Sequence, residues 1–108
     1  MSNTFKSAAT GSTTGVTTMY TCPASTSSVV HAMYLSNVDG TNDATISVSI
    51  SGSANFDHRS YILKTVDVPA DSTVVIEKPI NLGAADKLET QASANDDIDV
   101  FASILEIT

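Results

Sequence analysis

The sequence predicts an all-β domain, either an antiparallel β-sandwich or a jelly-roll-like barrel of seven to eight strands. Short runs of β-branched and aromatic residues alternate between apolar and polar positions, which is the pattern of half-buried strands. Turn-forming residues separate these runs at roughly even spacing, and no long stretch shows helical periodicity. Ser and Thr supply 29 of the 108 residues, a composition that suits strands with a hydroxyl-bearing outer surface. We expect a single domain over residues 1–108.

The closing stretch, residues 98–108, carries the strongest strand signal, because it is rich in β-branched residues and lacks Pro and Gly. Side chains alternate between the two faces of a strand. One face would carry Ile98, Val100, Ala102 and Ile104, and the other would carry Phe101, Leu105 and Ile107. A strand that is apolar on both faces is expected to be covered on both, which places it in the centre of a sheet.

The N-terminal segment allows two interpretations. Residues 3–10 can form a first strand anchored by Phe5, which would pair as a hairpin with a second strand over residues 16–22. Alternatively, residues 1–15 form an arm that docks on a neighbouring subunit, because the segment is weakly apolar and terminal. Phe5 and Lys6 are the candidate contact residues of this segment.

Residues 28–37 predict another strand whose two faces are both largely apolar, and therefore a second candidate for a central position. The expected faces are Val29, His31, Met33 and Leu35 on one side, and Val30, Ala32 and Tyr34 on the other. Four further strands are expected over residues 44–51, 58–66, 72–77 and 87–92. The first of these four alternates cleanly, with Ile46, Val48 and Ile50 inward and hydroxyl side chains outward.

The net charge of −7, from 12 acidic and 5 basic residues, disfavours two classes of partner. Nucleic-acid binding needs Lys and Arg to displace phosphate counterions, and anionic membrane surfaces attract basic segments. No run of apolar residues is long enough to span a membrane. Cys22 is the single cysteine, so we expect no internal disulfide and a small apolar side chain near a strand end. The first six residues lack the apolar stretch of a secretory signal, so a product of the cytoplasm is expected.

No motif predicts catalysis or a bound cofactor. The chain has no phosphate-binding glycine loop, no dinucleotide fingerprint and no Gly-x-Ser-x-Gly elbow. His31 lies in the middle of an expected strand and is interpreted as a core or interface histidine, and His58 as an exposed residue where a loop meets a strand. A serine hydrolase would need one of them beside a Ser and an acid, and no local signature supports that.

Two acidic loops are weighed as calcium sites. One contains Asp39, Asn42 and Asp43, and the other, residues 95–99, contains Asn95, Asp96, Asp97 and Asp99. Calcium takes about six to eight oxygen ligands, more than either loop offers, and neither loop has the EF-hand spacing. Turn chemistry is the favoured interpretation, because Asn and Asp bond their own backbone and tolerate left-handed conformations. No metal site is therefore assigned.

Phe56, Arg59 and Tyr61 gather around one expected loop and form the candidate contact patch. Aromatic residues and Arg are enriched at the centres of protein interfaces. In the alternative interpretation, Phe56 folds back onto the core and Tyr61 points inward from its strand. Together with Phe5 and Lys6, these three are the residues expected to contact other subunits.

Several segments of the chain carry a family resemblance. They are residues 20–23 (Tyr-Thr-Cys-Pro), 29–37, 61–64, 68–70 (Val-Pro-Ala), 86–88 and 99–107, which ends in Ser-Ile-Leu-Glu-Ile. These segments resemble a group of small virion structural proteins of tailed bacteriophages, best represented in marine and cyanobacterial phages. A Tyr-Thr-x-Pro strand end, a mid-chain Val-Pro-Ala turn and a terminal Ser-x-Leu-Glu-Ile strand typify that group. The chain departs from it at His31 and Met33, where small residues usually follow the paired valines.

The resemblance implies a non-enzymatic, all-β component of a virus particle. The leading expectation is a capsid decoration, or cement, protein that is made in the host cytoplasm and sits on the outer surface of the capsid. It would bridge subunits of the major capsid protein or contact other virion proteins, as a homo-oligomer with a trimer favoured. Two alternatives stay open: a tail, baseplate or fibre-attachment component in the same fold, and a glycan-binding module. Sugar-binding surfaces usually use exposed aromatic residues, and this chain has no Trp.

Overall fold

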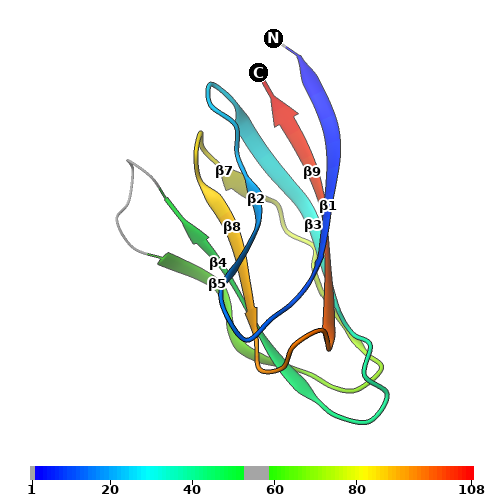
Figure 1. Ribbon diagram of the computed structural model, residues 1–108. Coiled ribbons are helices and arrows are strands. Elements are labelled where there is room, and N and C mark those ends of the chain that lie inside the picture. Colours follow the sequence, from blue (N-terminus) through cyan, green and yellow to red (C-terminus); the bar gives the residue numbers. More distant parts are fainter. Residues whose placement is uncertain (1, 53–58) are drawn as a thin grey trace.

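In the computed structural model, which describes residues 2–52 and 59–108, the chain is an all-β sandwich. The described residues form nine strands: β1 (Asn3–Gly11), β2 (Thr17–Thr21), β3 (Ser27–Asn37), β4 (Ala44–Ser51), β5 (Arg59–Val68), β6 (Thr73–Ile76), β7 (Ile80–Leu82), β8 (Lys87–Ala92) and β9 (Ile98–Ile107). One sheet has the order β1-β9-β3-β6, with β7 also paired to β3, and the other has the order β2-β8-β4-β5 (Figure 1). The predicted fold class is confirmed. The described part of the chain contains no helix, and therefore none long and apolar enough to cross a membrane.

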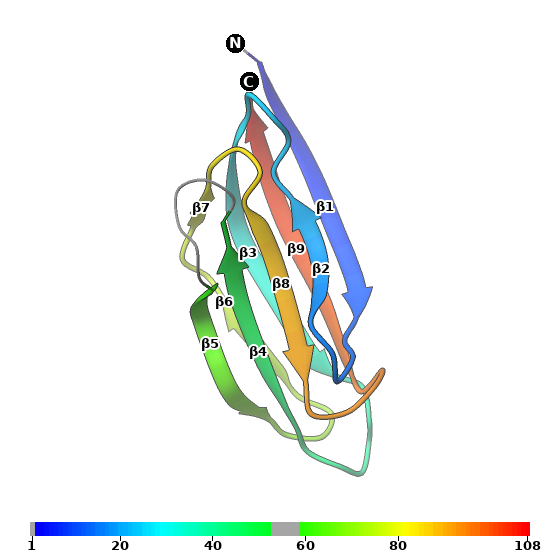
Figure 2. The same cartoon turned by 60° about the vertical axis from the view of Figure 1, so that its left-hand side comes forward.

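The strands follow the jelly-roll order. If β6 and β7 are taken as one interrupted strand, the first strand pairs with the last, the second with the last but one, and so on inward. The nested pairs are β1·β9, β2·β8, β3·β6/β7 and β4·β5, all antiparallel. The pairings β3·β9 and β4·β8 join them into two sheets that pack face to face (Figure 2). A two-sheet sandwich with this order is a jelly roll.

The predicted N-terminal hairpin is wrong, because β1 and β2 lie in different sheets. β1 pairs with β9 along its whole length, and β2 pairs with β8. The connection over residues 12–16 crosses between the sheets and is held by backbone hydrogen bonds. Ser12 donates its N–H to the Ile98 carbonyl at 2.9 Å, and its own carbonyl accepts the Asp96 N–H at 2.8 Å. These bonds satisfy the backbone groups of Ser12, which a hairpin would have paired with the neighbouring strand. β1 itself lies in the sheet of its own chain.

The core lies between the two sheets and is built from alternate residues of the long strands. Its most deeply buried apolar side chains are Val30, Met33 and Leu35 on β3, Ile46 and Val48 on β4, Val68 on β5, Leu88 on β8, and Ile98, Val100, Ala102 and Ile104 on β9. The inward face predicted for residues 44–51 is confirmed by this pattern. The central position of the closing strand is also confirmed, because β9 pairs with β1 on one edge and with β3 on the other.

The expectation that β9 is covered on both faces is wrong for the single chain. Phe101, on the outer side, is 42% exposed, and Leu105 and Ile107 are half-buried. A two-layer sandwich covers only the inner face of each sheet. β9 is central because it pairs along both edges, and its outer face has no third layer against it.

A β-bulge in β3 changes which residues face the core. The register with β9 shifts between Val30 and Ala32, so His31 is the extra residue and the alternation restarts after it. As a result, Val30 and Met33 are both fully buried, whereas His31 is exposed and Val29 is half-buried on the outer side. The predicted faces are therefore wrong before the bulge and right after it, and the interpretation of His31 as a core residue is wrong.

A second irregularity lies in β5, at Thr65. The register with β4 shifts there, so that Val66 faces Ile46 while Leu63 faces Val48. Thr65 has a φ of 53°, in the left-handed region, where a β-branched residue is strained. Its N–H is donated to the Ser47 hydroxyl at 2.9 Å, which holds the bulge in place.

The expected effect of replacing Thr65 by glycine is a gain in stability of about 1 kcal/mol. Glycine adopts a positive φ without steric cost, so the relief of strain should exceed the entropy that glycine adds to the unfolded chain. The matched control is Thr45→Gly in β4, which is not among the residues with positive φ. That variant should lose about 0.5 to 1 kcal/mol. Urea denaturation of both variants tests this, and an equal loss of stability in the two would contradict the strain at Thr65.

Candidate functional site

The outer face of the β1-β9-β3-β6 sheet is the candidate functional surface. The strand registers place its outward side chains in rows that run across the sheet. Its apolar members, which we call the apolar face, are Phe5 and Ala9 on β1, Phe101, Leu105 and Ile107 on β9, Val29 and Tyr34 on β3, and Val75 on β6. Phe5 is 76% exposed, and Tyr34, Phe101 and Val75 are 41–43% exposed. Exposed apolar side chains gathered on one face of a sheet are typical of interaction sites.

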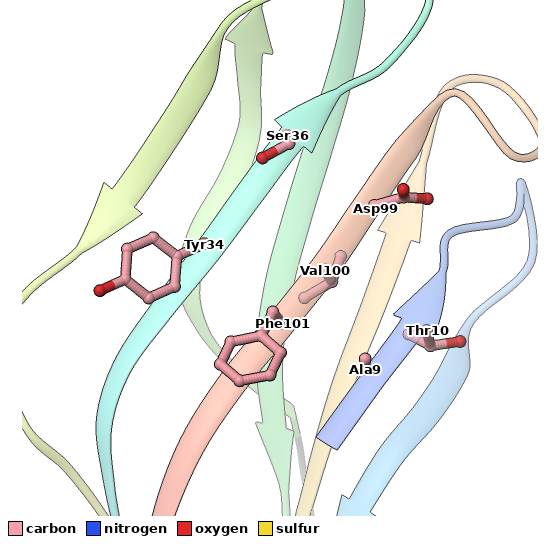
Figure 3. Close-up of a pocket in the computed structure, with 7 residues that line it drawn as sticks. All are labelled: Ala9, Thr10, Tyr34, Ser36, Asp99, Val100 and Phe101. Carbon is pink, nitrogen blue, oxygen red and sulfur yellow. The ribbon is translucent and has the colours of Figure 1, made fainter. Parts of the chain in front are cut away.

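A shallow hollow of about 370 Å³ lies at one end of the apolar face (Figure 3). Its lining consists of Ala9, Thr10, Tyr34, Ser36, Asp99, Val100 and Phe101. The rings of Tyr34 and Phe101 come from neighbouring strands, with centroids 6.2 Å apart and planes inclined by 42°. The hollow therefore combines an aromatic surface with the hydroxyl group of Ser36 and the carboxylate of Asp99.

The two outer faces of the sandwich differ in chemistry. One row across the opposite sheet is mostly polar and consists of Thr18, Glu89, Ser49 and Tyr61. A row across the apolar face consists instead of Ala9, Phe101, Tyr34 and Val75. Among the described residues that face outward from β1, β9, β3 and β6, Asp99 is the one carboxylate, and none is Lys, Arg or Glu. Interface centres are depleted in charged residues, so the apolar face is the better candidate for a contact surface.

Phe5 and Lys6, predicted as contact residues, lie on opposite sides of β1. Phe5 belongs to the apolar face, and its ring stacks near the exposed ring of His31, with centroids 6.1 Å apart. Lys6 faces the other way, and its Nζ lies 3.1 Å from Glu106 Oε1. Only Phe5 is therefore placed to contact a partner through the apolar face.

Of the other predicted contact residues, Tyr61 does not join this surface. Tyr61 lies on β5 in the opposite sheet, 44% exposed, with the Lys64 Nζ 4.9 Å from its ring centroid. The alternative interpretation, in which Tyr61 points inward, is therefore wrong. Arg59 begins β5, and Phe56 and His58 lie outside the described residues.

Tyr34, Val75 and Phe101 were not predicted as contact residues. The sequence signal for Tyr34 and Phe101 is the second apolar side of the strands at residues 28–37 and 98–108, which was interpreted as buried; Val75 lies in the strand predicted over residues 72–77. The missing information was that β3 and β9 are neighbours, with Tyr34 directly opposite Phe101.

A polar cluster at the end of the sandwich near the two termini involves four strands. Glu106 on β9 is buried and accepts a hydrogen bond from the Tyr20 hydroxyl on β2, while Lys6 on β1 pairs with its other oxygen. The Tyr20 hydroxyl also lies 2.7 Å from the Ser28 hydroxyl on β3. The Ser28 hydroxyl in turn lies 3.1 Å from the buried Cys22 sulfur. The cluster links the two sheets and satisfies a buried carboxylate.

The electrostatics of this cluster suit a structural contact. Burial, followed by the hydrogen bond to Glu106, raises the pKa of Tyr20 from its ordinary 10.0 to about 12. The hydrogen bond from Tyr20, with help from the Lys6 ammonium, lowers the pKa of Glu106, although burial opposes that shift. General acid–base catalysis works best with groups that titrate near the operating pH. Both of these groups are shifted away from neutrality.

Replacing Tyr20 by phenylalanine is expected to cost about 1 to 2 kcal/mol near neutral pH, because Glu106 loses a buried hydrogen bond. It should also change the stability of the protein at high pH. Since the folded state raises the pKa of Tyr20, its contribution is fully present below pH 10.0 and is lost as the pH rises towards about 12. Urea denaturation as a function of pH should show that loss in the wild type and a flatter curve in Tyr20→Phe. The control is Tyr34→Phe, which should keep the wild-type slope because Tyr20 remains.

The carboxylates of the first acidic loop are engaged with the backbone. Asp39 accepts the N–H groups of Thr41 and Asn42 at 2.9 and 3.3 Å, and these bonds lower its pKa. Asp43 accepts the Ala70 N–H at 3.0 Å. These contacts agree with the turn chemistry favoured for this loop.

In the second acidic loop, Asn95 accepts the Thr14 N–H at 2.9 Å, and Asp96 has a φ of 61°. A left-handed residue of this kind is common for Asp in turns. Within residues 2–52 and 59–108, no group of three or more His, Cys, Asp or Glu side chains is arranged to hold a metal ion.

The candidate surface is thus defined by geometry: an exposed apolar sheet face with a hollow at one end, on a jelly-roll body. A jelly-roll architecture alone does not identify a function, because unrelated activities share it. No family model, curated protein or solved structure matches this chain.

Proposed function

We propose that the protein is a non-enzymatic structural component of a phage particle, a decoration protein that bridges major capsid protein subunits on the outside of the capsid. The observation that carries this proposal is the apolar face, because a single chain leaves it uncovered. Jelly rolls are common in viral capsid proteins, which supports the proposal by analogy. The resemblance of residues 20–107 to small phage virion proteins supports the same function.

The mechanism is thermodynamic linkage. A protein that binds the closed, expanded shell better than any other state stabilises that shell by mass action. The net charge of −7 favours the outside of a head, because the packaged DNA makes the interior strongly anionic. The chain would need no cofactor for this role.

The test is to extract the protein from particles that contain it and to challenge the stripped heads with heat. Stripped heads should break at a lower temperature than intact heads, and adding back the purified protein should restore their resistance. Heads that are equally robust without it would contradict the role in stabilising the capsid. The number of copies per particle distinguishes a location on the head from one on the tail. A copy number comparable with that of the major capsid protein indicates the head, and one that matches the rotational symmetry of the tail indicates the tail.

The hollow favours a second candidate function, glycan binding. Tyr34 and Phe101 offer ring faces for stacking, and Asp99 with Ser36 offers hydrogen-bonding groups for sugar hydroxyls. A glycan array with the wild type and with Asp99→Asn tests this function. Binding that is lost in Asp99→Asn would support the glycan-binding role, and no binding on the array would remove it.

A further inference from the structure

The apolar face also indicates how copies of the chain associate. We propose that two copies pack through this face, related by a two-fold axis, so that the two β1-β9-β3-β6 sheets lie against each other. The paired sheets would supply the missing layer over the outer side of β9. This inference goes beyond the proposed function, because it concerns the free protein; binding to a capsid through the same face would separate the two copies.

Charge favours a second copy as the occupant. The whole chain carries −7, so two copies repel each other wherever their charged surfaces meet. Among the described outward residues of this sheet, only Asp99 is a carboxylate, and it lies at the end of the face beside Gly11 and Ser36. A basic partner would have few carboxylates to pair with on this face. A second copy can approach through the same face without burying a charge at the centre of the interface.

The relief of the face is self-complementary. One row carries bulky side chains, the next carries small ones, and the third is bulky again. These rows are Phe5, Leu105 and Val29; then Ser7, Ser103 and Ala32; then Ala9, Phe101, Tyr34 and Val75. The exposed His31 ring lies beside Phe5, at the bulge between the first and second rows. A two-fold axis that lies between the sheets and runs parallel to the rows can place a bulky row of each copy against the small row of the other. Facing sheets in sandwich cores interdigitate in this way.

The area of the face is sufficient for a dimer. β9 has 10 residues, so at about 3.3 Å per residue it is about 33 Å long, and four strands about 4.8 Å apart give a width of about 19 Å. The face therefore measures about 600 Å², and because the offset by one row leaves about one fifth of it uncovered, pairing two copies would bury about 1,000 Å², close to the smallest area of a specific interface. We expect a dissociation constant in the micromolar range, because interfaces of this size are typical of weak or transient complexes.

The test compares two tyrosines of nearly equal exposure on opposite sheets, Tyr34 at 43% and Tyr61 at 44%. Sedimentation equilibrium of the wild type should give a mass of about 22 kDa, twice the 11.2 kDa of one chain. Tyr34→Asp should raise the dissociation constant by about 30-fold or more, because it places a charge at the centre of the interface. Tyr61→Asp should leave it unchanged, and circular dichroism shows that both variants are folded.

A monomer at all concentrations, or a trimer, would overturn the inference, since a three-fold arrangement does not pair a face with itself. A dimer that survives Tyr34→Asp, or that Tyr61→Asp dissociates, would also overturn it. If Tyr34→Asp fails to fold, Phe101→Lys, at the same level of the neighbouring strand, gives the same comparison. The two outcomes remain distinguishable although both use this face, because sedimentation measures the free protein and add-back to stripped heads measures capsid binding.

Discussion

Replacing Ile104 by alanine is expected to lower the free energy of unfolding by about 3 to 4 kcal/mol. Ile104 is fully buried on the inner face of β9, opposite Val30 of β3 and on the strand that β1 and β3 both pair with. The substitution removes three carbon atoms from a position enclosed by both sheets, so the loss combines the transfer free energy with the cost of a cavity. Urea denaturation monitored by circular dichroism measures the change.

The matched control is the next residue, Leu105→Ala, on the outer side of the same strand. Leu105 is half-buried, and the expected loss is below about 1 kcal/mol because the site lies next to solvent and leaves no closed cavity. Both substitutions should be made in the Tyr34→Asp background, so that association of two copies does not add to the measured stability. Equal losses in the two variants would mean that β9 is covered on both sides within one chain.

Local pattern was sufficient to predict the strands with simple alternation. The bounds predicted for β4 and β8, residues 44–51 and 87–92, are those of the structure. Both strands have one inward face and one polar face, and this alternation depends only on neighbouring residues. β7 (Ile80–Leu82) was missed, because three residues are too few to show a period.

Pairing could not be predicted in the same way, because it joins residues far apart in the sequence. β1 finds its partner at the opposite end of the chain, where Asn3 pairs with Ile107. The shortest connection suggested a hairpin, but the jelly-roll order sends β2 to the other sheet. The candidate surface was missed for the same reason. Tyr34 and Phe101 form a surface only because β3 and β9 are neighbours.

The bulge at His31 was the feature hardest to predict, and it has a large expected consequence. Val30→Asp should destabilise the protein by at least about 4 kcal/mol, because it places an unpaired carboxylate in a fully buried site between the sheets. A loss of this size is comparable with the total stability of many small domains. We expect the variant to be largely unfolded by circular dichroism and by its thermal melting.

Val29→Asp differs from Val30→Asp by one position along β3 and is the control. Strict alternation back from Met33 would place Val29 inside and Val30 outside, whereas the bulge reverses the two. Val29→Asp should therefore remain folded and lose about 1 kcal/mol or less, the range of strand propensities. Since Val29 belongs to the apolar face, the same variant should weaken the association of two copies. If Val29→Asp unfolds and Val30→Asp does not, the alternation is unbroken and His31 faces the core.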